Sequence, residues 1–124
     1  MSRDVIRLMQ ALFLPGHGCG GAWSPAADLY RTADGWLVKF DLAGVRPEDV
    51  RVRAEGRRLS VSGSRRDGCL TEGCRHYHLE IAYSHFERCL ELPCDLARCD
   101  IATDFRDGML HVRVRLEKSN GDRE

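Results

Sequence analysis

The sequence lacks an excess of charge of either sign, because Lys and Arg together number 19 and Asp and Glu together also number 19. A domain that binds nucleic acid normally carries a basic excess that neutralises phosphates. We therefore expect no nucleic acid among the partners. A net charge of zero also leaves little repulsion between copies of the chain, which favours self-association.

The sequence also lacks an apolar run long enough to cross a bilayer, which takes about 20 residues. Its most apolar stretch, VIRLMQALFL, begins at Val5 and is interrupted by Arg7 and Gln10. Asp4 stands where a secretion signal would carry positive charge. We expect no integral membrane association and a cytoplasmic location, in which the six cysteines are mostly reduced.

Signatures of catalysis and of phosphate binding are missing as well. The run GHGCGG (16–21) follows no predicted strand and precedes no Gly-Lys-Ser/Thr, so it is not a phosphate-binding loop. The five histidines, including His85 beside Ser84, provide no set of nucleophile, base and orienting group. We expect no enzyme and no bound cofactor.

Residues 1–22 are expected to form an N-terminal arm and a glycine-rich hinge. Apolar residues at helical spacing predict a short helix, which Pro15 and the glycines after it end. A helix of about ten residues is marginally stable on its own in water. The arm is therefore helical or partly disordered, and its apolar side chains need cover from a partner or from its own domain. These side chains are Val5, Ile6, Leu8, Met9, Leu12, Phe13 and Leu14.

From Trp23 onward the periodicity becomes that of β-strands. Apolar and polar residues alternate in five stretches: residues 35–42, 50–54, 58–64, 86–92 and 110–116. Turn signals built from Gly, Pro and Asp separate these stretches. The pattern predicts an all-β domain over residues 23–116, an immunoglobulin-like antiparallel β-sandwich, followed by a short polar tail at 117–124.

A long polar connection at residues 65–83 interrupts the series, with a possible strand from about residue 74 to 81. Connections of this length usually carry function or leave the domain. Strand alternation would place Cys74, His76 and His78 on one face. Together with Cys69 they are the best candidates for metal binding or a redox response, although their spacing is unlike that of closed zinc sites.

Four motifs, in order and at the expected spacing, make the chain resemble the small heat-shock proteins, the α-crystallin-domain family. The motifs are WSPAADLY (23–30), VKFDLAGVRPED (38–49), FERCLELP (86–93) and IATDFRDGML (101–110). Departures from the family pattern are Ala43 in place of proline, Thr103 in place of alanine, Asp107 in place of asparagine and Glu117 in place of a common proline. The tail carries no isoleucine-x-isoleucine anchor, so large regular shells are not implied.

The resemblance implies an ATP-independent chaperone, a holdase that binds unfolded or partly unfolded client proteins and passes them to ATP-dependent chaperones. Two client-binding surfaces follow from it. One is the apolar arm at residues 1–14. The other is a groove between the strand at 50–54 and the strands at 102–106 and 110–114. Its expected lining residues are Val50, Val52, Phe105, Leu110 and Val112.

The resemblance also implies a homodimer, with higher oligomers left open. In bacterial and plant-type members, a strand in the connection at 65–83 swaps onto the sheet edge of the partner. The matching segment comprises Arg75, His76, Tyr77, His78, Leu79 and Glu80. Arg88 resembles the interface arginine of the family.

Two other classes of function stay open at this point. The same sandwich serves as a co-chaperone or adaptor module with one defined folded partner. Alternatively, the protein responds to metal or redox state, for instance by pairing Cys69 or Cys74 between protomers. Cys89, Cys94 and Cys99, spaced five residues apart, fit neither one strand face nor a zinc site and are interpreted as structural or incidental thiols.

Overall fold

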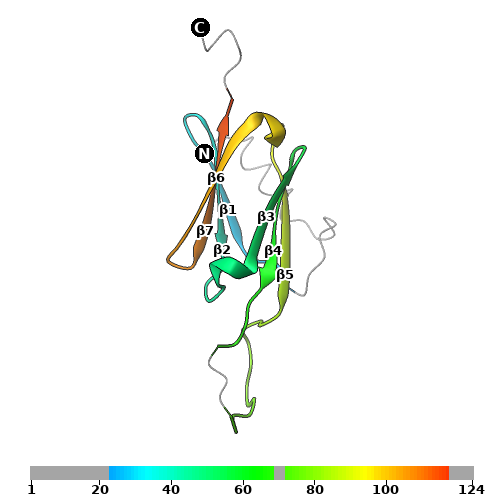
Figure 1. The fold of residues 1–124 in the computed structure, drawn as a ribbon, viewed down its shortest axis with the longest axis vertical. Coiled ribbons are helices and arrows are strands. Elements are labelled where there is room, and N and C mark those ends of the chain that lie inside the picture. Colours follow the sequence, from blue (N-terminus) through cyan, green and yellow to red (C-terminus); the bar gives the residue numbers. More distant parts are fainter. Residues whose placement is uncertain (1–22, 69–71, 118–124) are drawn as a thin grey trace.

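The structure, a computed structural model, describes residues 23–68 and 72–117. Within these ranges the chain forms two facing β-sheets (Figure 1). The strands are β1 (Ala27–Arg31), β2 (Gly35–Asp41), β3 (Val50–Glu55), β4 (Arg58–Ser64), β5 (His85–Glu91), β6 (Cys99–Arg106) and β7 (Met109–Leu116). Two single 3-10 turns, η1 (Pro47–Asp49) and η2 (Leu96–Arg98), precede β3 and β6. The arm predicted at 1–22 lies outside the described residues.

One sheet has the strand order β1-β2-β7-β6 and the other has the order β3-β4-β5. All the strand pairs within them are antiparallel. The chain changes sheet twice, through η1 and again through η2. The prediction of an antiparallel β-sandwich is confirmed.

The core lies between the sheets and is built from the inward positions of alternating strands. Val38 and Phe40 on β2 are fully buried, and so are Leu59 and Val61 on β4. Phe86 on β5 fills the same space and is also fully buried. A buried side chain of this size stabilises the fold by about 1.5–3 kcal/mol. The period-two pattern of the sequence is thus the pattern of core contacts.

The connection between β4 and β5, residues 65–84, is called the long loop below. Figure 1 shows it projecting beyond one end of the sandwich, away from both sheets. Its residues 72–84 form no strand within the single chain. A strand that pairs only with another chain would make no backbone hydrogen-bond ladder within a single chain. The swapped strand therefore stays a prediction. Among the described residues there is no helix long and apolar enough to cross a membrane.

Candidate functional site

The long loop carries a row of exposed apolar side chains. Tyr77, Leu79, Ile81 and Tyr83 are 101%, 56%, 58% and 40% exposed, and they are the exposed large hydrophobic residues of the described chain. Their spacing of two is that of one face of a β-strand. Apolar residues gathered in this way usually mark a surface that contacts another molecule. We call these four residues the apolar row.

Part of this row was predicted from the sequence. Tyr77 and Leu79 were predicted to lie at a dimer interface, whereas Ile81 and Tyr83 were left out. Ile81 and Tyr83 could have been found by continuing the alternation of Tyr77 and Leu79 for four more residues. The polar positions between them are exposed as well, and His78 Nε2 lies 2.7 Å from Glu80 Oε2. Arg75 and His76 are also exposed on this loop.

At its root, the long loop is tied to the sandwich by Arg65, the first residue after β4. The Arg65 side chain donates hydrogen bonds to the carbonyl oxygens of Ala82, at 2.8 Å, and of Ala43, at 3.3 Å. Its guanidinium carbon lies 4.2 Å from the ring centre of Trp23 and 5.7 Å from that of Tyr83. Sequence reasoning did not single out Arg65, because its partners are distant along the chain.

The predicted interface arginine, Arg88, lies on β5 and is half-buried. Its Nη1 donates a hydrogen bond to the Pro25 carbonyl oxygen at 3.0 Å. Burial lowers the pKa of the Arg88 guanidinium from its ordinary value. Arg88 therefore links β5 to the segment that leads into β1, and its role in a dimer stays a prediction.

The residues predicted to line the groove fall into two groups. Val50 and Val52 on β3 and Phe105 on β6 are partly buried and pack against the core. Leu110 and Val112, in contrast, are 4% and 0% exposed, so they belong to the core and offer no surface to a client. β7 lies between β2 and β6, inside its sheet, whereas β3 and β6 are outer strands.

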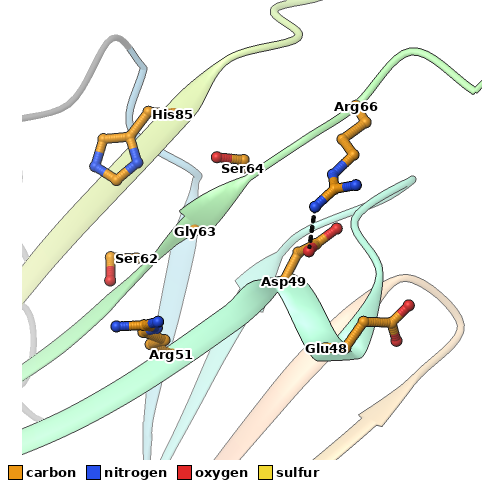
Figure 2. Close-up of a pocket in the computed structure, with 8 residues that line it drawn as sticks. All are labelled: Glu48, Asp49, Arg51, Ser62, Gly63, Ser64, Arg66 and His85. Atoms are coloured by element: carbon orange, nitrogen blue, oxygen red, sulfur yellow. Dashed lines mark hydrogen bonds and ion pairs between the residues drawn. The ribbon is translucent and has the colours of Figure 1, made fainter.

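A polar pocket of about 320 Å³, which no sequence pattern predicted, lies beside the root of the long loop (Figure 2). In Figure 2, Arg66 reaches from the loop toward Asp49 on η1, and its Nη2 lies 3.0 Å from Asp49 Oδ1. Gly63 on β4 lines the same pocket. A Cβ atom at Gly63 would lie 2.0 Å from the Asp49 carbonyl oxygen. The pocket therefore marks a close approach of η1 to β4.

The cysteines divide by their surroundings. Cys74 is an exposed free thiol on the long loop, and Cys94 and Cys99 are free thiols that pack partly against the core. Cys89 is disulfide-bonded, which departs from the expectation of reduced thiols. Within residues 23–68 and 72–117, no three His, Cys, Asp or Glu side chains gather closely enough to hold a metal ion. Cys69, the fourth residue of the candidate metal set, lies outside these ranges.

Cys94 and Cys99 lie on either side of η2 and contact each other. Burial and, to a lesser degree, neighbouring Cys99 raise the pKa of the Cys94 thiol from 9.0 to about 11. Cys94 is thus held as a neutral thiol at physiological pH, and the thiolate is the reactive form.

We therefore expect iodoacetamide to alkylate Cys94 slowly at pH 8. Its rate should lie on the order of 100-fold below that of a thiol with the ordinary pKa of about 8.5. The rate should rise about tenfold per pH unit until the pH approaches 11, the pKa of this thiol.

Since the folded-state pKa of Cys94 is raised, its contribution to the free energy of unfolding is present below pH 9 and declines as the pH rises. Mass spectrometry of alkylated peptides measures the rate, and fast alkylation at pH 8 would contradict the burial.

The sequence matches the Hsp20/alpha crystallin family over residues 28–124. It is 33% identical over 93 residues to spore protein SP21 of Stigmatella aurantiaca, covering 75% of this chain and 55% of that protein. It is 31% identical over 103 residues to heat shock protein 16 of Schizosaccharomyces pombe, covering 80% of this chain and 71% of the relative. The chain spans about half the length of several curated relatives that it matches.

The fold shows the same relationship. The solved structure of heat shock protein 16.0 from Schizosaccharomyces pombe superposes with a TM-score of 0.68 at 28% identity, over 84% of this chain and 82% of that one. The match begins at Asp28 in β1 and takes in all the remaining strands of the sandwich. The family resemblance noted in the four motifs is therefore confirmed, and the chain belongs to the Hsp20/alpha crystallin family.

Proposed function

We propose that this protein is an ATP-independent chaperone of the holdase type, which binds partly unfolded proteins and keeps them from aggregating. The observation that carries the proposal is membership of the Hsp20/alpha crystallin family. Unfolding proteins expose apolar segments and unpaired strand edges. The described chain has features that suit such partners, namely the apolar row and the outer strands β3 and β6.

The client-binding surfaces in this proposal are the apolar arm at residues 1–14 and the outer strands. On β3 and β6, Val50, Val52, Phe105 and Ile101 provide partly buried apolar surface. The side chains proposed on the arm include Met9 and several leucines, which adapt to partners of irregular shape. One arm binds weakly, because each buried side chain contributes only about 1.5–3 kcal/mol before ordering costs. Two arms on one particle bind more tightly through their effective concentration.

The second part of the proposal is a homodimer formed through the long loop. The apolar row has strand periodicity, but within the described chain residues 72–84 pair with no strand. Pairing with an outer strand of a second copy would bury the row and would also cover an exposed sheet edge. A cytoplasmic location and transfer of clients to ATP-dependent chaperones belong to this proposal as well.

The holdase activity is tested with citrate synthase that is heated until it aggregates. We expect the purified protein, in molar excess, to suppress the rise in light scattering without ATP, and added ATP to change nothing. Lysozyme at the same concentration serves as the inert control. Unchanged aggregation in the presence of the protein would refute the proposal.

Deletion of residues 1–14 separates the holdase from an adaptor with one folded partner. A holdase that uses the arm should lose most of its capacity to suppress scattering. An adaptor would keep its partner, because its recognition surface lies on the folded sandwich. The deletion leaves the described domain complete, so circular dichroism should be unchanged apart from the removed residues.

A further inference from the structure

Arg65 connects segments that lie outside the strands, one of which, at Trp23, is also joined to β5 by an isolated bridge to Phe86. Its partners are Trp23 before β1, Ala43 in the turn after β2, and Ala82 and Tyr83 at the end of the long loop. All four lie outside the strands. Arg65 thus joins the point where the loop leaves the sandwich to the point where it returns.

The contacts use the particular shape of a guanidinium group. Nε donates to the Ala82 carbonyl at 2.8 Å and Nη1 donates to the Ala43 carbonyl at 3.3 Å. The planar face is then left for the ring of Trp23, whose centre is 4.2 Å from the guanidinium carbon. A lysine ammonium can contact the ring, but it lacks the planar fork that serves two carbonyls at once.

Two hydrogen bonds to one backbone carbonyl also close this junction. The Arg65 amide donates to the Ser84 carbonyl oxygen at 3.1 Å. The Trp23 indole Nε1 donates to that same oxygen, also at 3.1 Å. The Ser84 carbonyl oxygen therefore accepts two hydrogen bonds, one of them from the edge of the Trp23 ring that Arg65 contacts. Residues 77–83 return to the sandwich at this junction.

A hollow of about 530 Å³ lies inside the loop, between its outgoing and returning segments. Arg65 lines it together with Leu79, Ile81 and Tyr83, three members of the apolar row. Arg65 therefore lies close enough to the apolar row to influence the orientation of its side chains.

We infer that Arg65 is a positioning residue, which fixes the long loop in the orientation that presents its apolar row to a second copy of the chain. This inference rests on the dimer proposed above. Arg65 itself is absent from the buried core and contributes no side chain to it. Its loss should therefore release the loop while leaving the sandwich folded.

The test compares Arg65→Ala with Arg65→Lys and with Arg66→Ala. Arg66 is the matched control, because it is the next residue and its ion pair is made to Asp49 rather than to the returning segment. Hydrogen exchange measured by NMR at the residue 65 amide and at the Trp23 indole N–H reports on the junction, since both donate to Ser84. Exchange at Val61 and Val112, which lie in strand ladders, reports on the sandwich.

We expect Arg65→Ala to speed exchange at the two junction groups at least about tenfold and to leave Val61 and Val112 unchanged, because only local opening is affected. The dimer dissociation constant should rise at least about tenfold as well. Arg65→Lys should fall between the wild type and Arg65→Ala, and Arg66→Ala should resemble the wild type.

Unchanged junction exchange in Arg65→Ala would overturn the inference, and so would equal acceleration in the ladders, which would indicate a purely structural role. Release of the loop with an unchanged dimer constant would also overturn it. If the wild type were a monomer at all concentrations, the proposed dimer would fail. The junction exchange would then still decide whether Arg65 holds the loop.

Discussion

Replacing Leu79 and Ile81 together with Asp should convert the proposed dimer into monomers without unfolding the sandwich. Both side chains are more than half exposed in the single chain, so the folded monomer does not depend on them. In a symmetric dimer each substitution occurs twice, and each apolar side chain removed from the interface costs about 1.5–3 kcal/mol. A loss of at least roughly 4 kcal/mol corresponds to about a thousand-fold higher dissociation constant.

Sedimentation velocity over a range of protein concentrations measures this constant. The matched control places two negative charges elsewhere, as Ala33→Asp and Ala97→Asp, at exposed positions in the turn after β1 and on η2. The control should dimerise like the wild type. Thermal unfolding of the monomeric variant should still be cooperative. A double variant that dimerises with wild-type affinity would rule out the apolar row as the interface.

The second large effect is expected at glycines where two backbone segments meet. A Cβ atom at Gly35 would lie 1.8 Å from the Val114 carbonyl oxygen, and one at Gly63 would lie 2.0 Å from the Asp49 carbonyl oxygen. Backbone atoms cannot move aside as a flexible side chain can. We expect Gly35→Ala and Gly63→Ala each to lower the free energy of unfolding by about 3 kcal/mol or more, a large part of the stability of a domain of this size.

Gly68 provides the matched control, because no atom of the described residues is found within 4 Å of a Cβ built there. Gly68→Ala should leave the free energy of unfolding within about 0.5 kcal/mol of the wild type. Urea unfolding at one fixed protein concentration makes the comparison valid for a protein that self-associates. Wild-type stability in Gly63→Ala would show that η1 can withdraw from β4.

Period-two alternation was sufficient to predict most of the sandwich from sequence. The strands predicted at 35–42, 50–54, 58–64, 86–92 and 110–116 agree with β2, β3, β4, β5 and β7 to within one residue at each end. β1 was not predicted as a separate strand, because Ala27 and Leu29 give only two inward positions in five residues. A pattern that short does not stand out from the turns around it.

The position of a strand within its sheet could not be predicted in the same way. Val112 on β7 and Val52 on β3 belong to similar valine-arginine alternations, yet one is fully buried and the other only partly. β7 has neighbours on both sides and β3 has one, but strand position alone does not decide burial, because Phe86 on the outer strand β5 is fully buried. Local sequence indicates which side chains face inward, but strand order depends on pairing between distant segments.

The junction at Arg65 was hidden for a related reason. Two of its partners are backbone carbonyls, 22 residues before it and 17 residues after it. Every residue type has such a carbonyl, so no side-chain pattern marks these partners. The apolar row was partly visible because it depends on the side chains of one continuous stretch.

Because the long loop leaves and returns through one junction, it is attached to the sandwich as a separable unit. Changes in its length or composition beyond that junction need not disturb the core. Each doubling of a flexible loop costs only about 0.6 kcal/mol in closure entropy. In the proposed dimer, the surface that selects a partner subunit and the framework that maintains the fold are therefore separate, and a substitution can alter one without the other.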